Sequence, residues 1–433
     1  MVQLPIQSVL PALKLKLQEA PNAVLVAAPG AGKTTQVPLA LLHEPWLEDR
    51  QIIMLEPRRL AARSAAAYMA SLLGEQVGQT VGYRVRHDTR VSTKTRIEVV
   101  TEGVLTRMLQ EDPALEHVGL LIFDEFHERN LHADVGLALA LESQAVLRDD
   151  LRILVMSATL DAELIAELLQ QAPIVRSEGH MYPIVTHHAA LRMEGKMEPA
   201  VAAAIMQAMQ QDEGDALVFL PGAGEIRRTA ALLDERLKGT GMQVRIAPLY
   251  GSLSQEEQDA AIAPSTTGER KVVLATSIAE TSLTVEGVRI VIDSGWMRVP
   301  RFSPRTGMMR LETIRVSRAS ADQRRGRAGR VAPGVCYRLW TAEEDRHLAA
   351  RTAPEMLEAD LASLVLELAA WGAEPDALRW LDAPPAPAVA QARELLRQLG
   401  ALDARGAVTA HGRSLAALPL HPRLAHMLRH AEP

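Results

Sequence analysis

Short runs of apolar residues alternate along most of the chain with longer stretches rich in Ala, Leu and Glu. Apolar runs without polar interruptions are typical of strands buried on both faces of a parallel sheet, and helices cover such sheets. The predicted strands are, in chain order, Val24–Ala28, Ile52–Glu56, Ile97–Thr101, Leu120–Asp124, Ile153–Ser157, Ala216–Leu220, Val244–Pro248, Val272–Thr276 and Val288–Asp293. The pattern predicts an α/β protein with two parallel-sheet domains, joined between Arg176 and Ile184.

The pattern changes after about Ala350, where strand-like runs disappear. Leu357–Trp371 and Ala388–Leu399 carry apolar residues at positions i, i+3 and i+4, which predicts amphipathic helices. Residues 399–408 combine apolar ends with a Gly- and Asp-containing centre, which indicates a short hairpin. Helices followed by a small hairpin predict a compact accessory domain of the winged-helix type.

Composition narrows the class of protein. The 433 residues, 48% of them hydrophobic, are too many for one ordinary domain and too apolar for a disordered chain. A single cysteine excludes a disulfide framework and a cysteine-based zinc site, and we expect Cys336 in the core because its neighbours are apolar. No apolar run is long enough to cross a membrane, and the first residues do not resemble a signal peptide. We therefore expect a cytoplasmic protein without a membrane partner.

The net charge of −6 argues against a protein that coats nucleic acid by its overall charge. The distribution of basic residues is more informative, because residues 296–330 hold ten Arg and only two acids, Glu312 and Asp322. Arg is suited to planar, bidentate recognition of phosphate. The excess of Arg over Lys in the whole chain could equally reflect the base composition of a genome, but the cluster predicts a local site for phosphate.

The strongest local signal follows the predicted strand Val24–Ala28. It consists of Gly30, Ala31, Gly32, Lys33, Thr34 and Thr35. A glycine-rich turn at the start of a helix presents backbone N–H groups that bind phosphates. Lys33 would reach the β and γ phosphates, and the Thr34 hydroxyl would bind Mg²⁺. The usual spacing has a glycine where this chain has Ala27. The strand–turn–helix context disfavours the alternative, an unrelated glycine turn.

Two adjacent acids, Asp124 and Glu125, follow the buried run Leu120–Phe123. Acids in that place are costly unless they meet a cation. Asp124 can hold Mg²⁺, and Glu125 can orient and deprotonate a water that attacks the γ-phosphate. The alternative is a strand end that emerges into solvent, but the phosphate loop upstream favours the catalytic interpretation.

The basic segment Gln323–Arg330 is a third signal. Arg327 and Arg330 lie one helical turn apart, so both side chains can face the same way. Together they would supply cations for the charge that develops on a transferring phosphoryl group. The alternative is a solvated basic helix, and the glycines of the segment argue against it because Gly is a poor helix former.

Eight segments occur in an order that resembles a known family. They are Gly30–Thr35, Pro57–Ala62, Thr101–Gly103, Asp124–His127, Ser157–Thr159, Leu217–Gly222, Ala275–Thr284 and Gln323–Arg330. The order resembles the motif series of the DEAH-box helicases of superfamily 2, and the likeness extends from about residue 5 to residue 430. Phe126 and the stretch Glu56–Arg63 are most similar to one bacterial branch of that family.

The resemblance implies two tandem RecA-like parallel-sheet domains followed by a small winged-helix domain. ATP or another NTP would lie with Mg²⁺ in the cleft between the two domains, and RNA or single-stranded DNA would lie across their tops. We expect boundaries at 1–178, 179–348, 349–417 and 418–433, the last being the start of a helical domain that is not completed. The chain would then be a shortened form or an unusually short relative. The segment 298–313 is similar to the family's hairpin near the point of strand separation, and an ordinary domain-closing hairpin is the alternative.

The resemblance also assigns roles residue by residue. The catalytic residues would be Glu125, Gln323, Arg327 and Arg330, and the metal ligands Thr34 and Asp124. The residues coupling hydrolysis to domain movement would be His127, Ser157 and Thr159, and those contacting nucleic acid Arg58, Arg59, Thr101, Gly103, Thr276 and Thr281. Tyr68 and Ile262 occupy the positions that would flank the nucleotide base, with the alternative that both are core residues.

These features point to an ATP-dependent helicase or translocase that acts on RNA. One alternative is a nucleic-acid-stimulated ATPase that remodels ribonucleoprotein without processive unwinding. Another is a nucleic-acid-binding scaffold without turnover, which the presence of all the expected catalytic side chains disfavours. The contacts expected along the strand are to phosphate and sugar, so a DNA strand remains open as a substrate.

Overall fold

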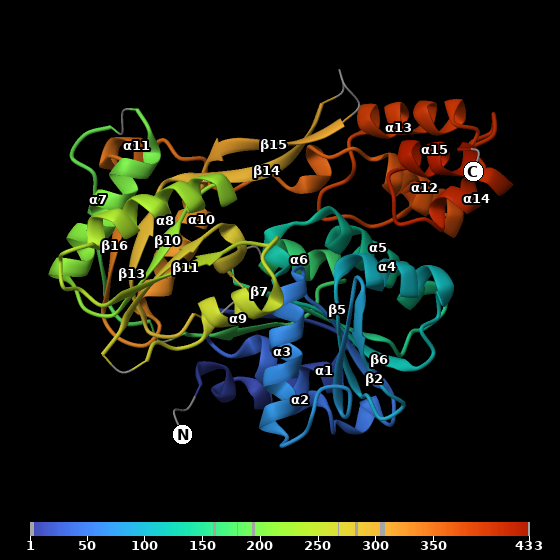
Figure 1. Cartoon of the computed structure of the whole chain (residues 1–433). Helices are drawn as coiled ribbons and strands as arrows, with labels where there is room; N and C mark the ends of the chain where they lie inside the picture. The colour runs from blue at the N-terminus through green and yellow to red at the C-terminus, as the bar shows by residue number, and fades with distance from the viewer. Residues whose placement is uncertain are drawn as a thin grey trace.

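A computed structural model of the chain describes residues 4–158, 162–179, 181–192, 195–266, 268–281, 285–303 and 308–431. Two α/β domains, each built on its own sheet, lie side by side, and a group of helices from the C-terminal part lies above the first of them (Figure 1). Within the described residues, no helix combines the length and the apolar character needed to cross a membrane.

The first sheet has eight strands in the order β4-β3-β5-β2-β6-β7-β1-β8, and all neighbours are parallel except β3 and β4. The strands are β1 Asn22–Ala27, β2 Gln51–Leu55, β3 Val81–Val85, β4 Asp88–Arg90, β5 Ile97–Val100, β6 Val118–Phe123, β7 Arg152–Ser157 and β8 Ile174–Ser177. The sequence predicted the five central strands. It missed β3, β4 and β8 because strands near a sheet edge bury less surface and carry polar or glycine residues that interrupt the apolar run.

The second sheet has six parallel strands in the order β11-β12-β10-β13-β16-β9. The strands are β9 Ile184–His188, β10 Asp215–Phe219, β11 Val244–Leu249, β12 Arg270–Ala275, β13 Val288–Asp293 and β16 Gly334–Arg338. The predicted runs correspond to β10, β11, β12 and β13. Strand β9 was missed because it is an edge strand with a polar half, and its neighbour β16 was not predicted either. Cys336 on β16 is fully buried, as expected.

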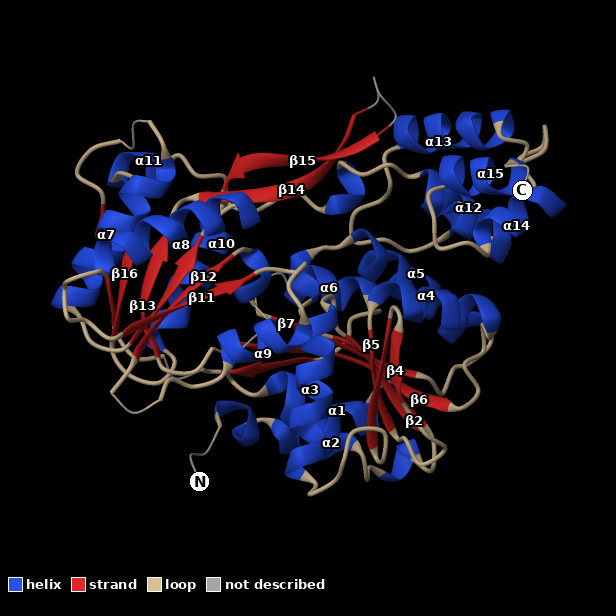
Figure 2. Ribbon diagram, in the orientation of Figure 1, coloured by secondary structure: helices blue, strands red, loops and turns tan. Residues whose placement is uncertain are grey.

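Helices cover both faces of each sheet (Figure 2). Those of the first domain are α1 Leu10–Glu19, α2 Lys33–Leu41, α3 Arg59–Leu72, α4 Glu102–Glu111, α5 Leu131–Val146 and α6 Ala162–Leu168. Those of the second are α7 Met197–Gln211, α8 Ala223–Leu237, α9 Gln255–Ile262, α10 Arg318–Gly326 and α11 Ala342–Arg346. The two faces of the first sheet form separate buried clusters, one with α1–α3 and one with α4–α6.

The C-terminal helices are α12 Ala362–Trp371, α13 Ala386–Gln398, α14 Ala410–Ala416 and α15 Pro422–His430. The long helix predicted from Leu357 was wrong in its start. A 3₁₀ turn ends at Leu357, and α12 begins only at Ala362, whose N–H is bound by the Asp360 carboxylate at 2.8 Å. The predicted hairpin is reduced to a single antiparallel bridge between Leu402 and Val408.

The C-terminal helices share a buried cluster with α4, α5 and α6 of the first domain. Two polar contacts reinforce this packing. Arg129 Nη1 lies 2.7 Å from Asp382 Oδ2, and the Leu131 N–H donates to Glu355 Oε2 at 3.0 Å. The C-terminal part is therefore packed on the first domain through apolar surface.

A two-stranded antiparallel hairpin, β14 Trp296–Ser303 and β15 Met308–Arg315, leaves the second domain and extends toward the C-terminal helices (Figure 1). The hairpin predicted for 298–313 is thus confirmed as an element, and its turn lies outside the described residues. Arg301 on β14 makes an ion pair of 3.1 Å with Glu358, just before α12. The second domain reaches the C-terminal part by this polar contact.

Candidate active site

The predicted phosphate loop connects the end of β1 to the start of α2. Gly30 and Gly32 have φ angles of 85° and 90°, a region that favours glycine. A Cβ added at Gly32 would lie 2.9 Å from the Leu4 side chain, so a side chain has no room there. Helix α2 begins at Lys33, which leaves the first N–H groups of the helix unpaired within it. The loop and the helix end together have the geometry that suits an anion site, and the role of these residues stays a prediction.

Lys33 is almost fully buried, and its Nζ lies 2.7 Å from Glu125 Oε1 and 3.7 Å from Asp124 Oδ1. Burial alone would lower the pKa of Lys33, but the two carboxylates raise it above its usual value. Burial also opposes the charge on Glu125, yet Lys33 lowers the pKa of this carboxyl to about 2. The lysine and the candidate base therefore form a buried ion pair in this structure.

Asp124 and Thr34 meet as expected for a shared metal site. Asp124 directly follows β6, and its Oδ2 accepts a hydrogen bond of 2.5 Å from the Thr34 hydroxyl. Burial, opposed by the charge of Lys33, raises the pKa of Asp124 to about 6. A hydroxyl and a carboxylate are the hard oxygen donors that Mg²⁺ prefers. The donor set fits magnesium.

Arg327 and Arg330 approach this site from the second domain. The Arg330 guanidinium packs against the phosphate loop, so that a Cβ added at Gly30 would lie 3.2 Å from its Nε. Its Nε and Nη2 are buried and have no hydrogen-bond partner in the part of the chain that the structure describes, and burial lowers its pKa to about 10. Arg327 donates to the Glu280 carbonyl at 3.0 Å and to the Thr281 carbonyl. Burial, together with the charge of Arg330, lowers the Arg327 pKa.

The other two arginines of the basic segment, Arg324 and Arg325, bind side chains within the second domain. Arg324 binds Asp293 at 2.8 Å and Glu280 at 3.1 Å, and Arg325 donates to the Thr186 hydroxyl at 2.8 Å. Of the two arginines that the sequence singled out, Arg330 packs against the phosphate loop, whereas Arg327, like Arg324 and Arg325, donates to groups of the second domain.

His127 lies in the 3₁₀ turn after the two acids. Its Nδ1 accepts from the Ala158 N–H at 3.3 Å and lies 3.4 Å from Glu125 Oε2. Because Nδ1 is an acceptor, the proton of the neutral ring is on Nε2, which is buried and meets no hydrogen-bond partner from the described residues. Burial lowers the pKa of His127. The ring is therefore hydrogen-bonded to the segment after β7, which contains Ser157, and lies beside Glu125; Thr159 lies outside the described residues.

The direct bridge between the two domains is made by the next residue, Glu128, which sequence reasoning missed. Its carboxylate binds Arg58 of the first domain at 3.1 Å and accepts a hydrogen bond from the Thr281 hydroxyl of the second. Arg58 also donates to the Ser277 carbonyl of the second domain at 2.6 Å. Arg58 and Thr281, expected at a nucleic-acid surface, are thus engaged in an interdomain network in this structure.

A second overlooked acid is Glu56, directly after β2. It is fully buried, and none of the described residues donates a hydrogen bond to either carboxylate oxygen. Burial, together with Asp124 and Glu125, raises the pKa of Glu56 well above its usual value. Its place at the carboxyl end of a central strand was the signal that could have identified it.

The remaining residues expected to contact nucleic acid lie at strand ends. Thr101 follows β5 and precedes α4, and a Cβ added at its neighbour Gly103 would meet nothing within 4 Å. Thr276 follows β12, and Arg59 is an exposed residue at the start of α3. In parallel sheets the carboxyl ends of the strands share one edge, so these residues lie at the strand edge where ligands usually bind.

The residues predicted to flank the base lie on helices of different domains. Tyr68 on α3 is 51% exposed, which rules out a core position, whereas Ile262 at the end of α9 is partly buried against the core of the second domain. Leu60 and Ala61, at the start of α3, belong to the same buried cluster as Ala261. The two helices therefore meet at the domain interface.

Gln323 lies on the wall of a cavity of about 850 Å³. The first domain, the second domain and the C-terminal part all line this cavity, through residues that include Arg58, Glu128, Ser277, Gln323, Pro354 and Trp380. A cavity of this size next to the domain bridge can hold a polymer strand or part of one.

Comparison with known families agrees with this arrangement. Residues 5–168 match the DEAD/DEAH box helicase family, residues 195–332 the helicase conserved C-terminal domain, and residues 392–420 the winged-helix helicase associated domain HA2. The matches fall in the first sheet domain, the second sheet domain and the C-terminal helices. The chain belongs to the DEAD/DEAH-box helicases.

Within that family the chain is similar to HrpB. It is 50% identical over 429 residues to the ATP-dependent RNA helicase HrpB of Escherichia coli, covering 99% of this chain and 52% of HrpB. A crystal structure of the E. coli DEAH/RHA helicase HrpB superposes with a TM-score of 0.94, covering 99% of this chain and 54% of that one. An ATP-dependent RNA helicase HrpA homolog of Haemophilus influenzae is 36% identical over 416 residues, or 94% of this chain and 31% of the relative. The chain thus spans about half the length of HrpB and less of the HrpA homolog.

Proposed function

We propose that the chain binds a nucleoside triphosphate with Mg²⁺ between its two sheet domains and hydrolyses it to move along or unwind RNA. One observation carries the proposal. Lys33, Thr34, Asp124 and Glu125 of the first domain converge with Arg330 of the second, and the buried Arg330 Nε and Nη2 atoms have no hydrogen-bond partner among the described residues. Unpaired cationic donors against a phosphate loop are costly unless an anion completes them.

The residues divide the chemistry of hydrolysis among them. The N–H groups of the phosphate loop and Lys33 bind the β and γ phosphates, and Arg327 and Arg330 stabilise the charge on the transferring group. Glu125 orients and deprotonates the attacking water. Its Oε2 accepts no hydrogen bond from the described residues, so this atom is available to a water.

Thr34 and Asp124 would hold the magnesium ion, Asp124 through a water. When bound, the metal would neutralise charge on the β and γ phosphates. It would also favour the ionised form of Asp124, whose buried carboxyl otherwise resists ionisation.

Glu128 would couple the nucleotide site to nucleic acid. It lies three residues after Glu125 and binds Arg58 and Thr281, which line the 850 Å³ cavity with Gln323. We place the RNA, or single-stranded DNA, in this region, in contact with Arg59, Thr101, Gly103 and Thr276 along the strand ends. We also propose the domain boundaries 1–178, 179–348 and 349–417, with residues 418–433 beginning a further segment.

The test is the NTPase rate with no nucleic acid, with RNA and with single-stranded DNA of equal length. We expect hydrolysis that needs Mg²⁺ and is stimulated by RNA. Absence of Mg²⁺-dependent hydrolysis in all three conditions would refute the proposed enzyme. Strand displacement from a tailed duplex then separates unwinding from remodelling without processive unwinding.

A further inference from the structure

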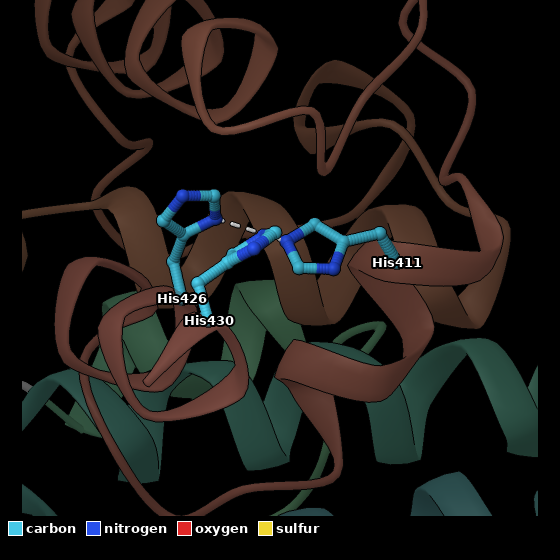
Figure 3. A group of neighbouring side chains, drawn as sticks. All are labelled: His411, His426 and His430. Atoms are coloured by element: carbon cyan, nitrogen blue, oxygen red, sulfur yellow. Dashed lines mark hydrogen bonds between the residues drawn. The ribbon is translucent and has the colours of Figure 1, made fainter. Parts of the chain in front are cut away.

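Three histidines from two helices of the C-terminal part face one another (Figure 3). His411 lies on α14, and His426 and His430 lie on α15. The ring centroids are 5.1 Å apart for His411 and His426, 5.3 Å for His411 and His430, and 4.4 Å for His426 and His430. One ring nitrogen from each residue can be chosen so that all three lie within 4.8 Å of one another.

The spacing along α15 brings two of the rings together. His426 and His430 are separated by four residues, so they lie one above the other on one face of the helix. The start of α14 adds His411, whose Nε2 lies 3.0 Å from Nδ1 of His426. Helices α14 and α15 are also joined by Arg429, which donates to the Ser414 carbonyl at 3.4 Å. The cluster is therefore assembled by the packing of two helices.

The surroundings of His411 disfavour its protonated form. Burial and the neighbouring imidazoles, with a contribution from Arg429, lower the pKa of His411. Three imidazoles this close repel one another when protonated, and the neutral ring is the form that binds a metal. Within the described part of the chain, the one hydrogen bond among the three rings joins His411 and His426, so His430 gains none from the cluster.

We propose that His411, His426 and His430 bind one divalent transition-metal ion of the zinc type. A metal–nitrogen bond of about 2.0–2.1 Å places the ligand atoms of a tetrahedral site roughly 3.4 Å apart. The nitrogens of His411 and His426 are already 3.0 Å apart, and one nitrogen from each of the three rings lies within 4.8 Å of the others. Side-chain rotations would bring the three nitrogens to the spacing of a metal site. Three ligands leave a fourth position for water.

The chemistry of the ligands selects the ion. Imidazole nitrogens suit Zn²⁺, Ni²⁺, Co²⁺ and Cu²⁺, whereas Mg²⁺ and Ca²⁺ prefer oxygen. This site is distinct from the magnesium site at Thr34 and Asp124. An ion bound to all three rings would fasten α15 to α14, because His411 is on one helix and the other two ligands are on the next. The ion would then stabilise the end of the winged-helix region.

The first test uses the whole chain without a histidine tag, stripped of metal by EDTA and kept in Mg²⁺ buffer. Co²⁺ is titrated while the visible absorption of four-coordinate Co²⁺ is recorded, and Zn²⁺ is then added. We expect one equivalent of Co²⁺ to bind and Zn²⁺ to displace it. We also expect Zn²⁺ to raise the thermal unfolding temperature, because an ion that binds only the folded chain stabilises it.

Variants assign the binding to this cluster. His430→Ala removes an exposed ligand with little risk to folding, and His411→Ala removes the ligand from the other helix. Each should weaken Zn²⁺ binding by about tenfold or more and abolish the Co²⁺ spectrum. His43→Ala, a change at an exposed histidine of the first domain, should leave both unchanged. Absence of the Co²⁺ signal in the parent chain, or a signal that persists in His430→Ala, would overturn the proposal.

Discussion

The Nζ of Lys33 lies 2.7 Å from Oε1 of Glu125, so the lysine offered to the phosphates is paired with the candidate base. This pairing lowers the pKa of Glu125 to about 2, against the effect of burial, and makes it a weak base in this state. A nucleotide that draws Lys33 toward its phosphates would weaken the pair and raise the basicity of Glu125. The chain would thereby gain its base at the time when a phosphate is present to be attacked.

Replacement of this base gives the first prediction. Glu125→Gln keeps the shape and one hydrogen bond to Lys33 but removes the base, so the turnover should fall by roughly 10²–10⁴-fold. The Kd for a fluorescent nucleotide in Mg²⁺ should stay within a few-fold of the parent value. Glu116→Gln, at an exposed acid of the same domain, serves as the control and should keep the parent rate. Near-parental hydrolysis by Glu125→Gln would mean that another group is the base.

The second prediction concerns Glu128. Glu128→Gln removes the charge that binds Arg58 and accepts from Thr281, while Lys33, Glu125 and Arg330 stay in place. Hydrolysis without RNA should remain close to the parent rate, and its stimulation by RNA should fall by about fivefold or more. Arg58→Ala should have a similar effect, and the double variant should lose little more, because both changes break one network. Additive losses would show that the two residues act separately.

The third prediction concerns the base of the nucleotide. Tyr68 is half-exposed on α3, and a tyrosine face opposite the aliphatic Ile262 would stack on any base. We expect ATP, GTP, CTP and UTP to be hydrolysed with kcat/KM values within about tenfold of one another. Tyr68→Ala should raise KM for all four. A preference for ATP above that range would indicate a hydrogen-bonded base pocket elsewhere.

The fourth prediction follows from Glu367 on α12, whose carboxyl pKa is raised by burial from 4.5 to about 7. The folded chain holds this proton more tightly than the unfolded chain does. The free energy of unfolding therefore falls as the pH rises from about 4.5 through 7, and the whole loss of stability is present above about pH 7. Glu367→Gln should raise the unfolding temperature at pH 8 and change it little at pH 5, with a gain of up to about 3 kcal/mol.

The matched control for this effect is Glu111→Gln, at an exposed acid at the end of α4. Glu111→Gln should change the unfolding temperature only slightly, and by the same amount at pH 5 and at pH 8. Equal stabilisation by Glu367→Gln at pH 5 and pH 8 would show that packing, rather than the charge of the buried carboxylate, limits stability at this position.

The parts of the molecule that could be predicted from the sequence are those governed by local pattern. The central strands were visible as apolar runs, and Gly30, Lys33 and Asp124 stand at fixed places between a strand and a helix. Glu128 was missed because its partners, Arg58 and Thr281, come from distant parts of the chain and meet only when the domains pack.

The histidine cluster and the start of α12 could not be predicted from the sequence either. The spacing of His426 and His430 is visible in the sequence, but the position of His411 depends on how α14 packs. The start of α12 was placed too early because the apolar period continues through a segment where the Asp360 side chain binds a backbone N–H and so favours a helix start.

The shared core of the C-terminal helices and the first domain has a consequence for motion. Val135 of the first domain and Leu364 of α12 are far apart in the sequence but belong to one buried cluster. The first domain and the C-terminal helices should therefore move as a single rigid piece. The second domain and its hairpin would then move relative to this rigid piece when the cleft between the two sheet domains opens. The ion pair of Arg301 with Glu358 would break during this movement and form again once in each cycle of hydrolysis.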